Sequence, residues 1–248
     1  MAARFNPFAF SQHGGPTQIE LPDVTFIVAQ DIAKNVDYTT TVIHQVRPQI
    51  VEGSTQGRIF YFQEKVFQDM VRLKYTELAE YTRELMAAVN VTYDCSLVID
   101  GTGVGGPVFD LYDEAGLDPL KIVFTSGESV SVQSGQRSKS SKFGLITGYG
   151  VPKADLVGAL VVAMEQGRMR RAKGVPFEQQ EREQYQNFAG RINEKTKYVK
   201  FGNSSDEIHD DIIVADAMAV WYGDHVTRAQ RRTRVEKSTY MTNPFGDL

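Results

Sequence analysis

Four aspartates in three separate parts of the sequence have the types and positions needed to bind metal ions. Asp31 and Asp100 each stand at the carboxyl end of a predicted strand, and Asp210 and Asp211 begin a predicted helix. Carboxylates that lie close together repel one another, so a cation is their expected partner. Oxygen ligands favour Mg²⁺ or Mn²⁺. Two such ions can activate a water molecule and stabilise the leaving oxygen of a phosphodiester.

The helix that begins near Asp211 has a face suited to close packing. Asp211, Ala215 and Ala219 recur every four residues and share this face, where the alanines allow the helix to approach a sheet. Asp210 points about 100° away around the helix and could reach a second ion. Capping is the structural alternative, because acids in a first helical turn are stabilised by about 0.3–1 kcal/mol each.

A glycine pattern near Asp100 offers a different interpretation. The apolar run 97–99 and Asp100 are followed by a turn. This turn contains the glycines of a G-x-G-x-x-G motif: Gly101, Gly103 and Gly106. A predicted strand precedes the motif and a predicted helix follows it, as a dinucleotide-binding site requires. Pro107 and the lack of a well-placed acid about 20 residues later, where only Glu128 is near, count against this alternative.

Composition indicates an ordinary globular chain. It has 248 residues, of which 42% are hydrophobic and 23% charged, with a net charge of −4. No apolar stretch approaches the roughly 20 residues of a membrane span, and there is no signal-peptide pattern. A single cysteine, Cys95, cannot form an intrachain disulfide, which suits a reducing cytosol. The pattern G-x-x-x-x-G-K-[ST] is absent, so no phosphate-binding loop for ATP is expected.

Hydrophobic periodicity predicts a mixed α/β arrangement. Alternating and β-branched runs predict three consecutive strands with short links at 24–30, 38–46 and 58–67. Helical spacing over 76–89 is followed by the strand ending at Asp100, a helix at 108–115 and a strand at 121–124. The first three strands therefore form an antiparallel meander, and the later ones pair in parallel through helical crossovers.

The second half of the chain is predicted to be mostly helical. Residues 127–150 form a hairpin or flap whose tip carries Arg137, Lys139 and Lys142. A helix begins at Pro152 and ends at Gly167, with one apolar face formed by Leu156, Leu160, Val161 and Met164. Surface helix 178–192, edge strand 198–201 and apolar helix 208–221 follow.

This element order is that of a ribonuclease H-like fold, an α/β mixed sheet with three antiparallel strands followed by parallel strands and flanked by helices. In that architecture the first and fourth strands end side by side at the centre of the sheet, so Asp31 and Asp100 should converge. We expect an N-terminal arm at 1–22, one domain at 23–224 and a basic tail at 225–248.

Several motifs together resemble the nuclease domain of the large terminase subunit of tailed bacteriophages. They cover roughly residues 24–224 and comprise Phe26–Thr41 with Asp31 and Asp37-Tyr38-Thr39, Val98–Gly105 with Asp100, Val151-Pro152-Lys153 with Leu156, and His209-Asp210-Asp211 with Asp216-Ala217. The resemblance implies a metal-dependent endonuclease that cuts concatemeric viral double-stranded DNA during genome packaging. By position, Asp31, Asp100 and Asp211 would bind metal with Asp210 as their neighbour, whereas Asp37 and Asp216 would be structural.

The resemblance also implies partners for this chain. Large terminases carry an ATPase motor that this sequence lacks, so either the chain is an isolated domain or the motor is encoded separately. The expected partners are this separate motor, a small terminase subunit and a portal protein, all in the host cell cytoplasm. Arg137, Lys139 and Lys142 are expected to contact DNA phosphates beside the acids. The remaining alternative is a packaging adaptor that keeps the fold without the chemistry.

Overall fold

The computed structural model describes residues 24–33, 37–50, 59–90, 94–102, 105–136, 141–192, 199–203 and 209–225, and the structural statements that follow concern these residues. The predicted N-terminal arm and residues 226–248 of the predicted tail lie outside them, as do Arg137 and Lys139. Within the described residues, no helix is both long enough and apolar enough to cross a bilayer.

The centre of the molecule is an eight-stranded mixed sheet. Strands β1 (Thr25–Asp31), β2 (Thr39–Ile50) and β3 (Ile59–Val71) form the predicted antiparallel meander. Strand β4 (Asp94–Asp100) pairs in parallel with the other edge of β1, and β5 (Leu120–Thr125) continues in parallel beside β4. The ribonuclease H-like order of elements predicts that β1 and β4 are neighbours, and they are. The fold is ribonuclease H-like.

Three further strands extend the sheet at its two edges. Strand β7 (Ile146–Pro152) pairs in parallel with β5, and β6 (Ser131–Ser134) pairs with β7 as an antiparallel hairpin. This hairpin confirms one of the two predicted forms of the segment 127–150. At the opposite edge, the short strand β8 (Met169–Arg171) pairs with β3 and was not predicted. Its three residues include two arginines and carry no alternating pattern.

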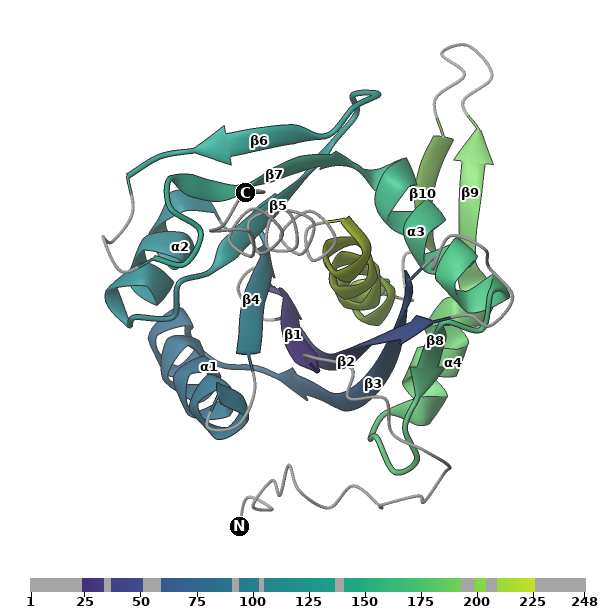
Figure 1. Cartoon of the computed structure of the whole chain (residues 1–248), viewed down its shortest axis with the longest axis horizontal. Helices are drawn as coiled ribbons and strands as arrows, with labels where there is room; N and C mark the ends of the chain where they lie inside the picture. The colour runs from purple at the N-terminus through teal and green to yellow at the C-terminus, as the bar shows by residue number, and fades with distance from the viewer. Residues whose placement is uncertain are drawn as a thin grey trace, which may run out of the picture.

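Helices cover both faces of the sheet. Helices α1 (Tyr75–Asn90) and α2 (Gly105–Glu114) pack on one face against Phe26, Val28, Leu97 and Ile99. Helix α3 (Lys153–Glu165) and the helix at 211–225 pack on the other face, against Ile27, Ala29 and Val98. In Figure 1 the sheet curves around the yellow-green helix at 211–225, with α1 and α2 outside the curve.

Two sequence expectations for the second half were wrong. The predicted helix 178–192 ends early, because α4 (Glu178–Asn187) is followed by β9 (Phe188–Ile192), which pairs with β10 (Val199–Asn203) in a separate two-stranded sheet. On α3, Val161 and Met164 are 45% and 46% exposed instead of buried. Val157 and Ala163 are the buried residues alongside Leu156 and Leu160, because the helix is rotated relative to the face we predicted.

Candidate metal centre

The register of β1 and β4 places Asp31 and Asp100 side by side. Gln30 pairs with Ile99, and each aspartate is the next residue of its strand. Side chains alternate between the two faces of a strand. Ile27 and Ala29 on β1, and Val98 on β4, face the helix at 211–225. Asp31 lies two residues after Ala29, and Asp100 lies two residues after Val98. Both aspartates therefore point to the same face as these residues.

Asp100 is held by the turn that follows its strand. Its Oδ1 accepts a hydrogen bond of 2.7 Å from the backbone N–H of Thr102, whose Oγ1 accepts one of 2.8 Å from the N–H of Phe124. Gly101 lies against β5, where an added Cβ would be 3.1 Å from Cβ of Lys121. The glycine is therefore explained by close packing between strands.

The sheet topology argues against the dinucleotide alternative. Dinucleotide-binding folds use a mostly parallel sheet and carry the G-x-G-x-x-G motif after the first strand. Here the motif follows β4, and the neighbouring β1 is antiparallel to β2. Gly106 lies inside α2, and Gly103 is outside the described residues.

Asp211 is brought to the same region by a tightly packed helix. Ala215 and Ala219 on the Asp211 face of this helix are fully buried, as the four-residue spacing predicts. At its start, the N–H of Ile212 donates a hydrogen bond of 2.9 Å to Oε1 of Gln184 from α4. The beginning of the helix is thus fixed between α4 and the sheet.

Asp210 is paired with a lysine that the sequence analysis gave no role. Nζ of Lys153, the first residue of α3, lies 3.2 Å from Oδ2 of Asp210. Lys153 directly follows β7, so the sheet itself positions this cation beside the acids. In the sequence, Lys153 was part of the Val151-Pro152-Lys153 motif. This motif contributed to the resemblance but did not indicate which residue Lys153 would pair with.

Electrostatics shows that the four carboxylates interact. Burial raises the pKa of Asp31 well above its ordinary value, and the negative charges of Asp100, Asp211 and Asp210 raise it further, while Lys153 opposes them. Burial also raises the pKa of Asp211 to about 6, with Asp210 adding to the shift and exposed His209 opposing it. The charges of three other acids, from two distant segments, therefore act on Asp31.

The donor set consists of carboxylate oxygens, which suits Mg²⁺ or Mn²⁺ better than zinc. Among the described residues, no three His, Cys, Asp or Glu side chains are gathered closely enough to hold a metal ion as they stand. The carboxylates thus share a common electrostatic environment without contacting a common point.

The helix that carries Asp211 is anchored by a buried polar network. Asp216 is fully buried, and its carboxylate accepts hydrogen bonds from Nζ of Lys65 (2.8 Å), Nε2 of His44 (2.9 Å) and the hydroxyl of Tyr185 (2.9 Å). Burial alone would raise the pKa of Asp216, but the charges of Lys65 and His44 lower it to about 2. Asp216 therefore joins this helix to β2, β3 and α4, in line with the structural role that we expected.

Of the three basic residues expected to contact DNA, the structure describes Lys142, and this residue lies away from the acids. The ammonium of Lys142 donates to the backbone oxygen of Cys95 and lies 3.6 Å from Oδ1 of Asp94, at the beginning of β4. Asp100 is at the other end of this strand, about 20 Å away at roughly 3.3 Å per residue. Our expectation that Lys142 lies beside the acids was therefore wrong, and its contact with DNA stays a prediction.

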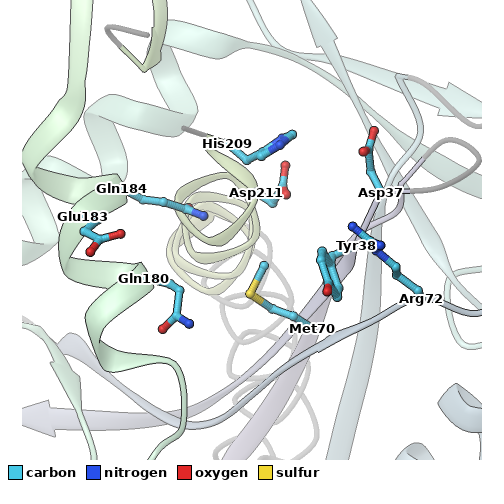
Figure 2. Close-up of a pocket in the computed structure, with 9 residues that line it drawn as sticks. All are labelled: Asp37, Tyr38, Met70, Arg72, Gln180, Glu183, Gln184, His209 and Asp211. Carbon is cyan, nitrogen blue, oxygen red and sulfur yellow. The ribbon is translucent and has the colours of Figure 1, made fainter. Parts of the chain in front are cut away.

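A groove that the sequence analysis missed adjoins the acids. It has a volume of about 280 Å³ and lies between the β2–β3 side, with Asp37, Tyr38 and Arg72, and the α4 side, with Gln180 and Gln184. Figure 2 shows Asp211 and His209 between these two walls. We call this feature the acid-side groove. Its two walls are more than 100 residues apart in sequence, so no local pattern could reveal it.

In comparisons with known proteins, the chain matches solved structures but no family model and no curated protein sequence. One similar solved structure is the human cytomegalovirus terminase nuclease domain, soaked with Mn and bound to an inhibitor, with 12% identity over 84% of this chain and 86% of that chain and a TM-score of 0.49. Another is the nuclease domain of the bacteriophage SPP1 large terminase with bound Mn, with 10% identity, 79% and 84% coverage and a TM-score of 0.43.

Proposed function

We propose that this chain is a metal-dependent endonuclease, the nuclease domain of a terminase large subunit, and that it hydrolyses phosphodiester bonds of double-stranded DNA. The observation that carries the proposal is the register of β1 and β4, which sets Asp31 beside Asp100 on the face covered by the helix that begins at Asp211. In line with this geometry, the charges of Asp100, Asp210 and Asp211 raise the pKa of Asp31. Buried like charges are costly unless a cation compensates them. A structural role alone would not favour four mutually repelling acids at one edge of the sheet.

In this proposal the acids hold two Mg²⁺ or Mn²⁺ ions. Asp31 and Asp100 supply oxygens from the sheet, and Asp210 and Asp211 supply oxygens from the opposing helix. The bound ions contribute an activated water and charge stabilisation at the leaving oxygen. Lys153 neutralises part of the acidic charge and keeps the Asp210 carboxylate oriented. The two solved structures described above were soaked with Mn or have Mn bound, the metal that we propose here.

Plasmid nicking tests the proposal. The chain is expected to nick supercoiled DNA with Mn²⁺ and to lose activity when the metal is chelated. Asp31→Asn and Asp100→Asn should each reduce the rate roughly 100-fold or more, because even residues that only orient metal ligands cost about 10–100-fold. Asp110→Asn on the exposed surface of α2 is the matched control. Equal nicking by Asp100→Asn would exclude the proposed centre.

Metal binding provides a second readout that does not depend on cleavage. Mn²⁺ should raise the unfolding temperature of the wild-type chain and of Asp110→Asn but not that of Asp31→Asn, because only a folded site binds the ion. Metal stabilisation without cleavage would favour the adaptor alternative. Stabilisation by NAD instead of Mn²⁺ would favour the dinucleotide alternative.

The biological substrate that we propose is concatemeric viral DNA, cut in the host cytoplasm at the start and end of packaging. A separate ATPase motor, a small terminase subunit and a portal protein are the proposed partners. In a packaging reaction reconstituted with the motor and portal, Asp100→Asn should leave concatemers uncut while the motor still hydrolyses ATP. Normal processing of concatemers by this variant would contradict the assignment.

A further inference from the structure

The acid-side groove contains a cation in an otherwise acidic setting. Asp37, Glu183 and Asp211 line it, together with exposed Arg72. The Arg72 guanidinium lies 4.1 Å from the centroid of the Tyr38 ring. Within the described part of the chain, no ion pair joins Arg72 to a carboxylate. A stacked guanidinium with free donors is suited to contact a phosphate group.

Tyr38 adds an aromatic surface at the same place. Its side chain is 42% exposed, and in Figure 2 it lies with Met70 and Arg72 on the wall opposite α4. Exposed aromatic rings that stand beside a cation are typical of sites that bind unpaired nucleotides, since every base has a face that can stack. The amide side chains of Gln180 and Gln184 form the facing wall.

We infer that the acid-side groove binds one unpaired nucleotide of the DNA strand next to the bond that is cut. Arg72 contacts its phosphate, and Tyr38 stacks on its base. This inference rests on the proposed nuclease function, because Asp211 joins the groove to the candidate metal centre. The volume of about 280 Å³ is just below the roughly 300–1,000 Å³ of small-molecule sites, which fits a ligand no larger than one nucleotide.

Oligonucleotide binding tests the two contacts separately. The 248-residue chain is kept in Ca²⁺ to prevent cleavage and is titrated with a ten-nucleotide oligo(dT) and with an abasic strand of equal length and charge. Tyr38→Ala should weaken oligo(dT) binding about ten-fold and leave abasic binding unchanged, since it removes only stacking. Tyr38→Phe retains the ring and should bind like the wild type. Tyr38→Leu provides a second ring-free variant that preserves apolar contact.

Arg72→Ala should weaken both strands. It should also reduce the slope of log affinity against log salt by about 0.7, the value for one lost phosphate contact on a single strand. Arg83→Ala on α1, which packs on the other face of the sheet, is the matched control and should change neither quantity. Unchanged affinity in Tyr38→Ala and Arg72→Ala would overturn the inference, as would equal weakening of both strands by Tyr38→Ala.

Failure of the groove and failure of the nuclease proposal give different results. A wild-type chain that nicks plasmid with Mn²⁺ while both groove variants bind DNA normally would reject the groove alone. A wild-type chain that never cuts, but binds oligo(dT) through Tyr38 and Arg72, would reject the nuclease proposal and retain a nucleotide-binding groove.

Discussion

Nζ of Lys65 lies 2.8 Å from Oδ2 of Asp216, and both side chains are fully buried between the sheet and the helix at 211–225. Lys65 also lies 2.8 Å from Oε1 of Glu181 on α4. One cation thus bridges two carboxylates from different helices. The start of the helix at 211–225, where Asp211 lies, depends on this link for its position over the sheet.

Lys65→Met should destabilise the chain strongly. The substitution leaves the Asp216 carboxylate with His44 as its remaining basic partner and the Glu181 carboxylate with Arg171. Breaking a buried ion pair in this way costs about 3–5 kcal/mol. Urea denaturation at pH 7 measures the free energy of unfolding. Lys173→Met, an exposed lysine, is the control and should stay within about 0.5 kcal/mol of wild type. A loss below 1 kcal/mol in Lys65→Met would contradict the importance of the link.

Asp211→Asn should make the metal-free chain more stable at pH 8. The pKa of Asp211 is about 6 in the folded chain against an ordinary 3.8, so the folded chain binds this proton more tightly than the unfolded chain does. Stability therefore falls as pH rises from about 4 to about 6 and remains reduced above that range. After allowance for solvent screening, the gain is roughly 1–2 kcal/mol.

Unfolding in EDTA at several pH values tests this prediction. The advantage of Asp211→Asn should disappear below about pH 4, where the carboxyl is protonated in both states. Asp110→Asn, with an exposed carboxylate on α2, should show no comparable gain at pH 8. A destabilised Asp211→Asn at pH 8 would mean that Asp211 is a helix cap and not a strained member of an acidic cluster.

Lys153→Met should shift the pH dependence of the proposed cleavage. Lys153 lowers the pKa of Asp31, so its removal raises that pKa and moves the acid limb of the Mn²⁺-dependent rate profile to higher pH. Initial nicking rates between pH 5 and pH 9 measure the shift. Lys153→Arg keeps the positive charge beside Asp210 and should restore the wild-type profile. An unshifted acid limb in Lys153→Met would remove Lys153 from the site.

Two glycines on opposite sides of Lys153 should respond oppositely to alanine. At Gly148 on β7, an added Cβ would overlap the backbone oxygen of Lys121, so Gly148→Ala should lower stability by about 1–3 kcal/mol. At Gly158 inside α3, an added Cβ meets nothing within 4 Å, so Gly158→Ala should raise stability by about 0.5–1 kcal/mol. Thermal unfolding measures both, and a Gly148→Ala variant as stable as the wild type would contradict the close packing of β7 against Lys121.

Local periodicity was sufficient to predict the part of the fold that aligns Asp31 with Asp100. β1, β4 and β5 are short apolar runs bounded by turns, and the pattern of each is contained within the run. Other features depend on residues far apart in the sequence. β9 becomes a strand only because 199–203 pairs with it, and the contact between Lys153 and Asp210 joins residues 57 positions apart. Such relationships leave no periodic signal in either segment.

The same limit explains the misplacement of Lys142 and the omission of Tyr38 and Arg72. Basic residues in a hairpin suggest DNA contact, but sequence does not reveal which end of β4 the hairpin approaches. Tyr38 and Arg72 face each other because β2 and β3 are antiparallel neighbours, with Thr39 opposite Val71. That pairing was predictable, whereas the second wall of the groove comes from α4.

The pairing of β1 with β4 makes chain length near Asp100 as important as residue identity. Leu97 and Ile99 pack beneath α1 and α2, while Val98 and Asp100 belong to the opposite face. Loss of a single residue within β4 would exchange the two sets, burying the carboxylate among apolar side chains and bringing Leu97 and Ile99 to the face of the acids. One hydrophobic residue of β4 can therefore be replaced by another, but the number of residues in the strand before Asp100 must stay the same.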